Sequence, residues 1–148
     1  MKVNFLKSKI LIADDEQANI ALLEDVLENE GYTFFKSTQD SRKALDIYKE
    51  MCPDLVLLDL NMPYLDGFQV IEQLKEFEKD SYAPILVLTA QSDRNTRLRA
   101  LSAGARDYIE KPFDITEVTQ RISNMLEIRL LHNQVRDQNL ILEEKIRE

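Results

Sequence analysis

The sequence has a single cysteine, a single histidine and no tryptophan among its 148 residues. Cys52 has no disulfide partner and belongs to no cluster of metal-binding thiolates, a composition typical of a cytoplasmic protein. No apolar run approaches the ~20 residues that cross a bilayer. Segment 1–10 also lacks the apolar core and cleavage site of a signal peptide. The sequence therefore predicts a cytoplasmic protein with no membrane span.

Glycine and proline are also scarce, with three and four copies, while 44% of the residues are hydrophobic and 31% are charged. This composition is typical of one globular domain. The formal net charge of −8 argues against direct nucleic-acid binding, which requires a basic face. It is compatible with protein recognition or with a bound divalent cation, although acidity that only maintains solubility would give the same number.

Two hydrophobic periods alternate along the first 120 residues. Continuous apolar runs at 10–13, 32–35, 55–58, 85–88 and 107–109 predict buried strands. Between them lie segments with helical spacing, carried by Ile20, Leu23 and Leu27, by Ala44, Leu45 and Tyr48, by Phe68, Ile71 and Leu74, by Leu98 and Leu101, and by Ile115, Val118 and Ile122. Strand–helix alternation predicts an α/β fold: a doubly wound, flavodoxin-like, five-stranded parallel sheet of order 2-1-3-4-5.

Local signals agree with these helix boundaries. Gly31 and Gly104 occupy positions where a left-handed residue would end the first and fourth helices. Asp114 with Glu117 predicts a capping box at the start of the fifth helix. We expect an N-terminal extension over 1–8, one domain over 9–124 and an extended C-terminal helix over 125–148.

The C-terminal segment contains an apolar heptad pattern. Polar Gln138 and Lys145 interrupt it, so a solvated helical tail is the alternative to a coiled coil. We expect a homodimer through this helix. The predicted seam consists of Ile128, Leu131, Val135 and Leu142.

Polar residues follow the predicted strands at the edge where an open parallel sheet binds its ligands. Asp14 and Asp15 end the first strand, Asp59 ends the third, Thr89 ends the fourth and Lys111 follows the fifth. Singly, each has an ordinary explanation as a helix cap, a turn residue or a surface charge. Together they predict a site, because three carboxylates at one edge repel one another unless a cation is present.

The chemistry of this set favours phosphoryl transfer. Mg²⁺ (or Mn²⁺) suits an open site lined with carboxylates. A metal ion, the Lys111 ammonium and the Thr89 hydroxyl together can stabilise the charge on a transferring phosphoryl group. Asp59, at the middle of the sheet, is the candidate nucleophile that would form an aspartyl phosphate.

The five positions resemble the receiver domain of two-component response regulators, over roughly 9–126. Segments 59–67 and 102–105 also resemble that family. The resemblance implies that Asp59 accepts a phosphoryl group from a sensor histidine kinase or phosphotransfer protein. It further implies a metal site formed by Asp14, acting through water, with Asp15, Asp59 and the backbone carbonyl of Asn61.

The same resemblance assigns the remaining residues. Thr89 and Lys111 would contact the phosphoryl oxygens, and Tyr108 would change rotamer when Thr89 moves. The peptide bond between Lys111 and Pro112 would be cis. A receiver is a signalling switch rather than an enzyme, since it catalyses only its own phosphotransfer and dephosphorylation.

Other functions fit less well. A phosphatase or phosphotransferase with an aspartyl-phosphate intermediate would carry an acid two residues after its nucleophile, where Asn61 stands. In a flavodoxin-like cofactor binder, Asp14, Asp15 and Glu16 would repel the cofactor phosphate. His132 lacks the acidic neighbour expected of a phosphodonor histidine, so the sequence predicts an acceptor.

The output is less clear from the sequence. No helix-turn-helix with a basic recognition helix follows the predicted receiver. Segment 126–144 resembles the helical linkers that precede domains for cyclic di-GMP synthesis or hydrolysis. We therefore expect an output domain of this kind beyond residue 148.

Overall fold

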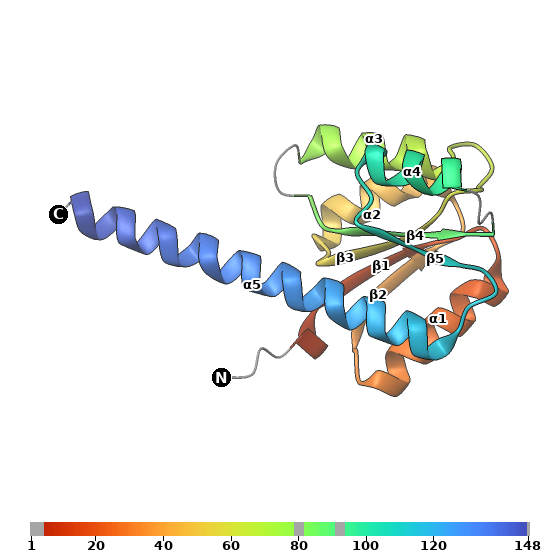
Figure 1. Ribbon diagram of the computed structural model, residues 1–148, viewed down its shortest axis with the longest axis horizontal. Coiled ribbons are helices and arrows are strands. Elements are labelled where there is room, and N and C mark those ends of the chain that lie inside the picture. Colours follow the sequence, from red (N-terminus) through yellow and green to blue (C-terminus); the bar gives the residue numbers. More distant parts are fainter. Residues whose placement is uncertain (1–4, 79–81, 91–93, 148) are drawn as a thin grey trace.

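Strands and helices alternate through the computed structural model, which describes residues 5–78, 82–90 and 94–147. Figure 1 shows one sheet between two layers of helices. The elements are η1 (Phe5–Lys7), β1 (Lys9–Ala13), α1 (Gln17–Glu30), β2 (Phe34–Thr38), η2 (Ser41–Lys43), α2 (Ala44–Met51), β3 (Leu55–Asp59), α3 (Gly67–Phe77), β4 (Ile85–Thr89), α4 (Arg94–Ala103), β5 (Asp107–Glu110) and α5 (Ile115–Arg147).

The five strands are parallel in the order β2-β1-β3-β4-β5, which confirms the predicted topology. The chain winds from β1 outward to β2 and then crosses back to β3 on the other side of β1. Because the order reverses between β1 and β3, the loops that follow these strands diverge and leave room for a ligand.

The core has one cluster on each face of the sheet, since successive side chains of a strand point in opposite directions. In β1, Leu11 and Ala13 pack with residues of α2 and α3, whereas Ile10 and Ile12 pack with residues of α1 and α5. This burial on both faces explains the continuous apolar runs of the central strands.

Helix boundaries follow the predicted signals in most places. Gly31 and Gly104 have φ angles of 98° and 126°, in the left-handed region. The carboxylate of Asp114 accepts hydrogen bonds from the backbone N–H groups of Thr116 (2.9 Å) and Glu117 (3.3 Å) at the start of α5. A capping box with both reciprocal hydrogen bonds occurs at α3, between Asp66 and Gln69.

The structure corrects the position and pattern of the second strand. β2 spans Phe34–Thr38 rather than 32–35. Tyr32 is buried, and its backbone N–H donates to the Leu27 carbonyl, so this residue completes the end of α1. β2 is an edge strand, and its residues alternate in exposure instead of being buried throughout.

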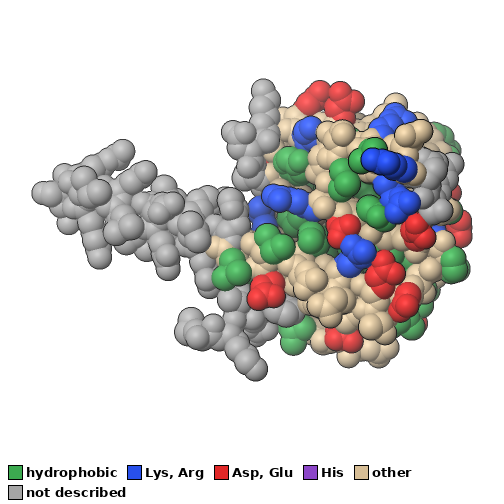
Figure 2. Space-filling model, in the orientation of Figure 1, with side chains coloured by type: hydrophobic (Ala, Val, Ile, Leu, Met, Phe, Trp, Pro, Cys, Tyr) green, Lys and Arg blue, Asp and Glu red, His purple; other side chains and the backbone are tan. Residues whose placement is uncertain are grey.

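Two predicted apolar stripes are also wrong in part. Leu98 and Leu101 of α4 are 49% and 40% exposed, and the small residue Ala100 faces the core instead. Ile115 is exposed at the start of α5. On the face shown in Figure 2, apolar side chains lie among acidic and basic ones.

Helix α5 is a continuous helix of 33 residues that first packs on the domain and then extends away from it (Figure 1). Val118, Ile122 and Leu126 are buried, whereas Ile128 and Leu131 are 55% and 46% exposed. The predicted seam residues Val135 and Leu142 have side chains outside the described part of the structure. None of the helices described is long and apolar enough to cross a membrane.

Candidate functional site

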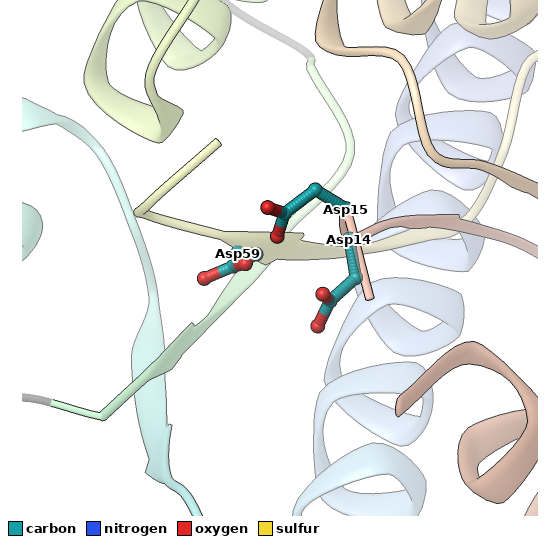
Figure 3. A group of neighbouring side chains, drawn as sticks. All are labelled: Asp14, Asp15 and Asp59. Atoms are coloured by element: carbon teal, nitrogen blue, oxygen red, sulfur yellow. The ribbon is translucent and has the colours of Figure 1, made fainter. Parts of the chain in front are cut away.

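Three carboxyl groups meet at the carboxyl edge of the sheet. Asp14 and Asp15 follow β1, and Asp59 is the last residue of β3. Each offers one oxygen atom that lies within 4.8 Å of the other two. Figure 3 shows Asp59 and the two residues that follow β1 around one small region. Asp14 and Asp59 are buried, and Asp15 is half-buried.

Hydrogen bonds fix one oxygen atom of each buried carboxylate. The Oδ1 atom of Asp14 accepts from the backbone N–H of Glu16 (2.9 Å) and from the side-chain amide of Asn19 (3.4 Å). The Oδ1 atom of Asp59 accepts from the backbone N–H of Asn61 (3.1 Å). Asn19 was not identified from the sequence, although its place in the first turn of α1, five residues after Asp14, was a usable signal.

Lys111 provides positive charge at the second oxygen atoms. Its Nζ atom lies 3.2 Å from Asp14 Oδ2 and 3.3 Å from Asp59 Oδ2. Burial alone would lower the pKa of this ammonium, but the charges of Asp59 and Asp14 outweigh burial and raise the pKa. Lys111 therefore stays protonated between the two carboxylates.

One ammonium does not balance three carboxylates. Burial, followed by repulsion from Asp14, raises the pKa of Asp59 to about 7, although the Asn61 N–H and Lys111 act in the opposite direction. An uncompensated carboxylate in such a place is costly, and a divalent cation would remove that cost. The donors are all carboxylate oxygens, which fits a hard cation such as Mg²⁺ or Mn²⁺.

The other predicted site residues lie at the ends of β4 and β5. Thr89 is buried as the last residue of β4, and its carbonyl accepts a hydrogen bond from the backbone N–H of Lys111 (2.8 Å). This contact joins the two strand ends that supply the hydroxyl and the ammonium. The bond between Lys111 and Pro112 is cis, as the sequence resemblance implied.

Tyr108 in β5 is half-buried and contacts α4. Its hydroxyl accepts a hydrogen bond of 2.9 Å from Arg97 Nη1, and the Arg97 guanidinium lies 5.2 Å from the ring centroid. No sequence pattern pairs Tyr108 with Arg97, because they belong to different elements. Tyr108 is therefore well placed to report movements at the end of β4, its neighbour in the sheet.

Comparison with known protein families identifies the arrangement. The profile of the response regulator receiver domain matches residues 10–123. The chain belongs to this family. The match includes all five predicted positions, from Asp14 to Lys111.

Individual relatives agree with this assignment. The chain is 45% identical over 120 residues to the ycf27 transcriptional regulator of Porphyridium aerugineum, covering 81% of this chain and 48% of that protein. It is 33% identical over 131 residues to the response regulator PleD of Caulobacter vibrioides, covering 88% and 29%. The chain thus spans half or less of the length of these relatives.

Solved structures show the same fold. A response regulator from Chloroflexus aurantiacus matches with a TM-score of 0.76 and 31% identity, over 82% of this chain and 98% of that one. CheY in a CheX–CheY–BeF₃–Mg²⁺ complex from Borrelia burgdorferi matches with a TM-score of 0.74 and 28% identity, over 79% and 87%. The fold and its family are therefore established for this chain.

Proposed function

We propose that this receiver domain accepts a phosphoryl group on Asp59 from a phosphohistidine of a sensor histidine kinase or phosphotransfer protein. The observation that carries the proposal is the position of the Asp59 carboxylate within the buried acidic cluster, 3.3 Å from the Lys111 ammonium. A carboxylate in this setting is a nucleophile beside a centre of positive charge. Intact-mass measurement after incubation with acetyl phosphate and Mg²⁺ tests the function and should show the addition of one phosphoryl group.

In the proposed reaction, an oxygen of Asp59 forms a bond to phosphorus while the bond from phosphorus to the donor imidazole nitrogen breaks. The electron pair of the broken bond stays on the imidazole. Lys111 Nζ, already near Asp59 Oδ2, would contact one phosphoryl oxygen, and the Thr89 hydroxyl at the end of β4 would contact another. Both groups stabilise charge on oxygen during transfer.

Asp14, Asp15, Asp59 and the backbone carbonyl of Asn61 would hold Mg²⁺ (or Mn²⁺), with Asp14 acting through water. The ion supplies positive charge against the phosphoryl oxygens when it is bound. The Mg²⁺ named in the Borrelia CheY complex supports this assignment by similarity. We further propose that the domain is a switch that catalyses only its own phosphorylation and dephosphorylation, in the cytoplasm.

The proposal extends to the output domain that the receiver would control. Helix α5 would connect the receiver to a further domain, and the likeness of segment 126–144 to certain linkers favours cyclic di-GMP synthesis or hydrolysis. The transcriptional regulators among the relatives make a DNA-binding output the alternative. In either case the receiver, which belongs to a chain with a net charge of −8, would not contact nucleic acid.

Thr89→Ala should separate phosphoryl uptake from the conformational response at Tyr108 and Arg97. Uptake should continue at about one tenth of the rate, because a hydrogen bond to a charged oxygen contributes about 1.5 kcal/mol. The shifts of the Tyr108 and Arg97 amides on addition of beryllofluoride should be smaller than in wild type, as measured by NMR. Thr116→Ala, an exposed site on α5, is the control. Amide shifts equal to those of wild type would show that Thr89 does not transmit the change from the phosphorylation site to Tyr108.

The exposed apolar residues of α5 should support a weak dimer. We expect sedimentation to show a concentration-dependent dimer that beryllofluoride tightens. Leu131→Ala/Val135→Ala should raise its dissociation constant by about tenfold, equivalent to 1.4 kcal/mol. Asn133→Ala lies off the heptad seam and should have no effect. A chain that stays monomeric in both states would contradict the seam, and dimers unaffected by the double substitution would place the contact on the receiver.

A further inference from the structure

The loop between β2 and α2 connects the two sides of the acidic cluster. At one end, the Thr38 carbonyl accepts a hydrogen bond of 3.1 Å from the backbone N–H of Asp14. At the other end, the Ser41 hydroxyl donates to the Pro63 carbonyl (2.8 Å) and accepts from the backbone N–H of Leu65 (3.1 Å). We call residues 38–42 the brace, because they contact both segments that supply the carboxylates shown in Figure 3.

The Ser41 hydroxyl makes two hydrogen bonds in a buried position. The residue is only 1% exposed, and its oxygen atom both donates and accepts a hydrogen bond. Both partners are backbone groups of the loop between β3 and α3, more than 20 residues along the chain. Replacement by alanine would leave these two groups without that partner, so the loop would lose its connection to the brace.

Between these two contacts, Tyr64 has a left-handed backbone with φ of 72°. This conformation is unfavourable for a residue with a β-carbon, and such residues concentrate at functional sites. The Arg42 guanidinium lies 3.6 Å from the centroid of the Tyr64 ring. Asp40 in turn holds Arg42 through hydrogen bonds to Nε (3.1 Å) and Nη2 (3.0 Å). The brace therefore stabilises the unusual backbone of Tyr64.

The rest of the same loop is anchored separately. Leu60 and Met62 are buried in the core on either side of Asn61. The loop then returns to its start, where the Gly67 N–H donates to the Leu60 carbonyl (2.9 Å). A β-carbon at position 67 would lie 2.7 Å from the Asp59 carbonyl oxygen. The loop is thus closed against Asp59, and its second half depends on the brace.

We infer that Ser41 and Tyr64 are positioning residues that set the affinity of the metal site. They hold the loop containing Asn61, whose backbone carbonyl completes the ligand set in the proposed function, on which this inference rests. Neither side chain needs to touch the metal ion or the phosphoryl group. Groups that orient metal ligands change metal affinity by about 10- to 100-fold when they are removed.

Titration of the metal-free chain with Mg²⁺ by calorimetry tests the inference. Ser41→Ala should weaken Mg²⁺ binding by about tenfold, at the lower limit for orienting groups. Ser37→Ala is the matched control, because Ser37 lies in β2, four residues before Ser41, but its hydroxyl donates to Glu24 on α1 (3.0 Å). At saturating Mg²⁺, phosphorylation of Ser41→Ala should return to within about twofold of wild type, since only binding is affected.

Tyr64→Leu gives a second test that does not depend on a buried residue. Tyr64 is 70% exposed, so the fold should persist, and loss of the contact with Arg42 should weaken Mg²⁺ binding by about threefold. If Ser41→Ala fails to fold, the Mg²⁺ affinity of Tyr64→Leu alone tests the inference. Unchanged Mg²⁺ affinity in the folded variants, with binding lost in Asp15→Asn, would overturn the inference but leave the proposed function intact. Wild-type affinity in Asp15→Asn would instead overturn the metal site itself.

Discussion

Asp59→Asn is expected to abolish phosphoryl uptake from acetyl phosphate and from a phosphorylated histidine donor. Asparagine has the shape of aspartate, but its amide lacks the nucleophilic carboxylate oxygen that would bond to phosphorus. Asp14 should not substitute, because its Oδ1 atom is held by the N–H of Glu16 and by Asn19 on the β1 side of the site. Radiolabelled transfer followed by acid gel electrophoresis measures the loss.

The fold of this variant should remain intact. Because burial raises the pKa of Asp59 to about 7, ionisation of this carboxyl makes the metal-free fold less stable as pH rises from about 4. Asparagine is neutral, so the free energy of unfolding in EDTA at pH 8 should not fall below that of wild type. Asp46→Asn, exposed on α2, is the control and should label normally. Full labelling of Asp59→Asn would show that Asp59 is not the phosphoryl acceptor.

Removal of divalent cations is expected to stop phosphorylation as completely as the loss of Asp59. The charges of three carboxylates are met by only one ammonium among the described residues that contact them, so an incoming phosphoryl group would be repelled. EDTA should reduce the initial rate below detection, and Mg²⁺ or Mn²⁺ in excess should restore it. Rapid-quench measurement of labelled protein gives this rate.

Asp15→Asn should reproduce the effect of EDTA at Mg²⁺ concentrations that saturate wild type. Asp15 is half-buried and can offer a carboxylate oxygen to the ion without the large change in buried charge expected at Asp14. Asp46→Asn again provides the control for a simple change in net charge. Undiminished phosphorylation in EDTA would show that positive charge from Lys111 suffices and that the proposed metal ligands are wrong.

Much of the fold could be predicted from the sequence because each central strand is buried on both faces. The runs at 55–58 and 85–88 therefore stand out from the helices around them, and β3 and β4 occur there. The edge strand β2 has no such run, since one side of it is open, and its prediction was displaced toward Tyr32. In α4, Leu98 and Leu101 have the spacing of a buried apolar stripe although both are exposed. The periodicity of the sequence alone could not distinguish such an exposed pair from a buried one.

The candidate site could be predicted because its residues end strands of one parallel sheet, which places them at one edge. Asp14, Asp59 and Lys111 are indeed in contact. The brace could not be predicted, because Ser41 and Arg42 follow no periodic pattern and contact the loop after β3 only through the packing of two loops. The pairing of Arg97 with Tyr108 depends on tertiary structure in the same way.

The most direct test of the central claim is to locate the phosphoryl group on the chain. The protein would be phosphorylated with acetyl phosphate and Mg²⁺, reduced with borohydride to convert the aspartyl phosphate to homoserine, digested and sequenced by tandem mass spectrometry. The account predicts homoserine at position 59 and unmodified Asp14 and Asp15. Homoserine at either of those residues, or phosphate on a serine, threonine or histidine, would contradict it.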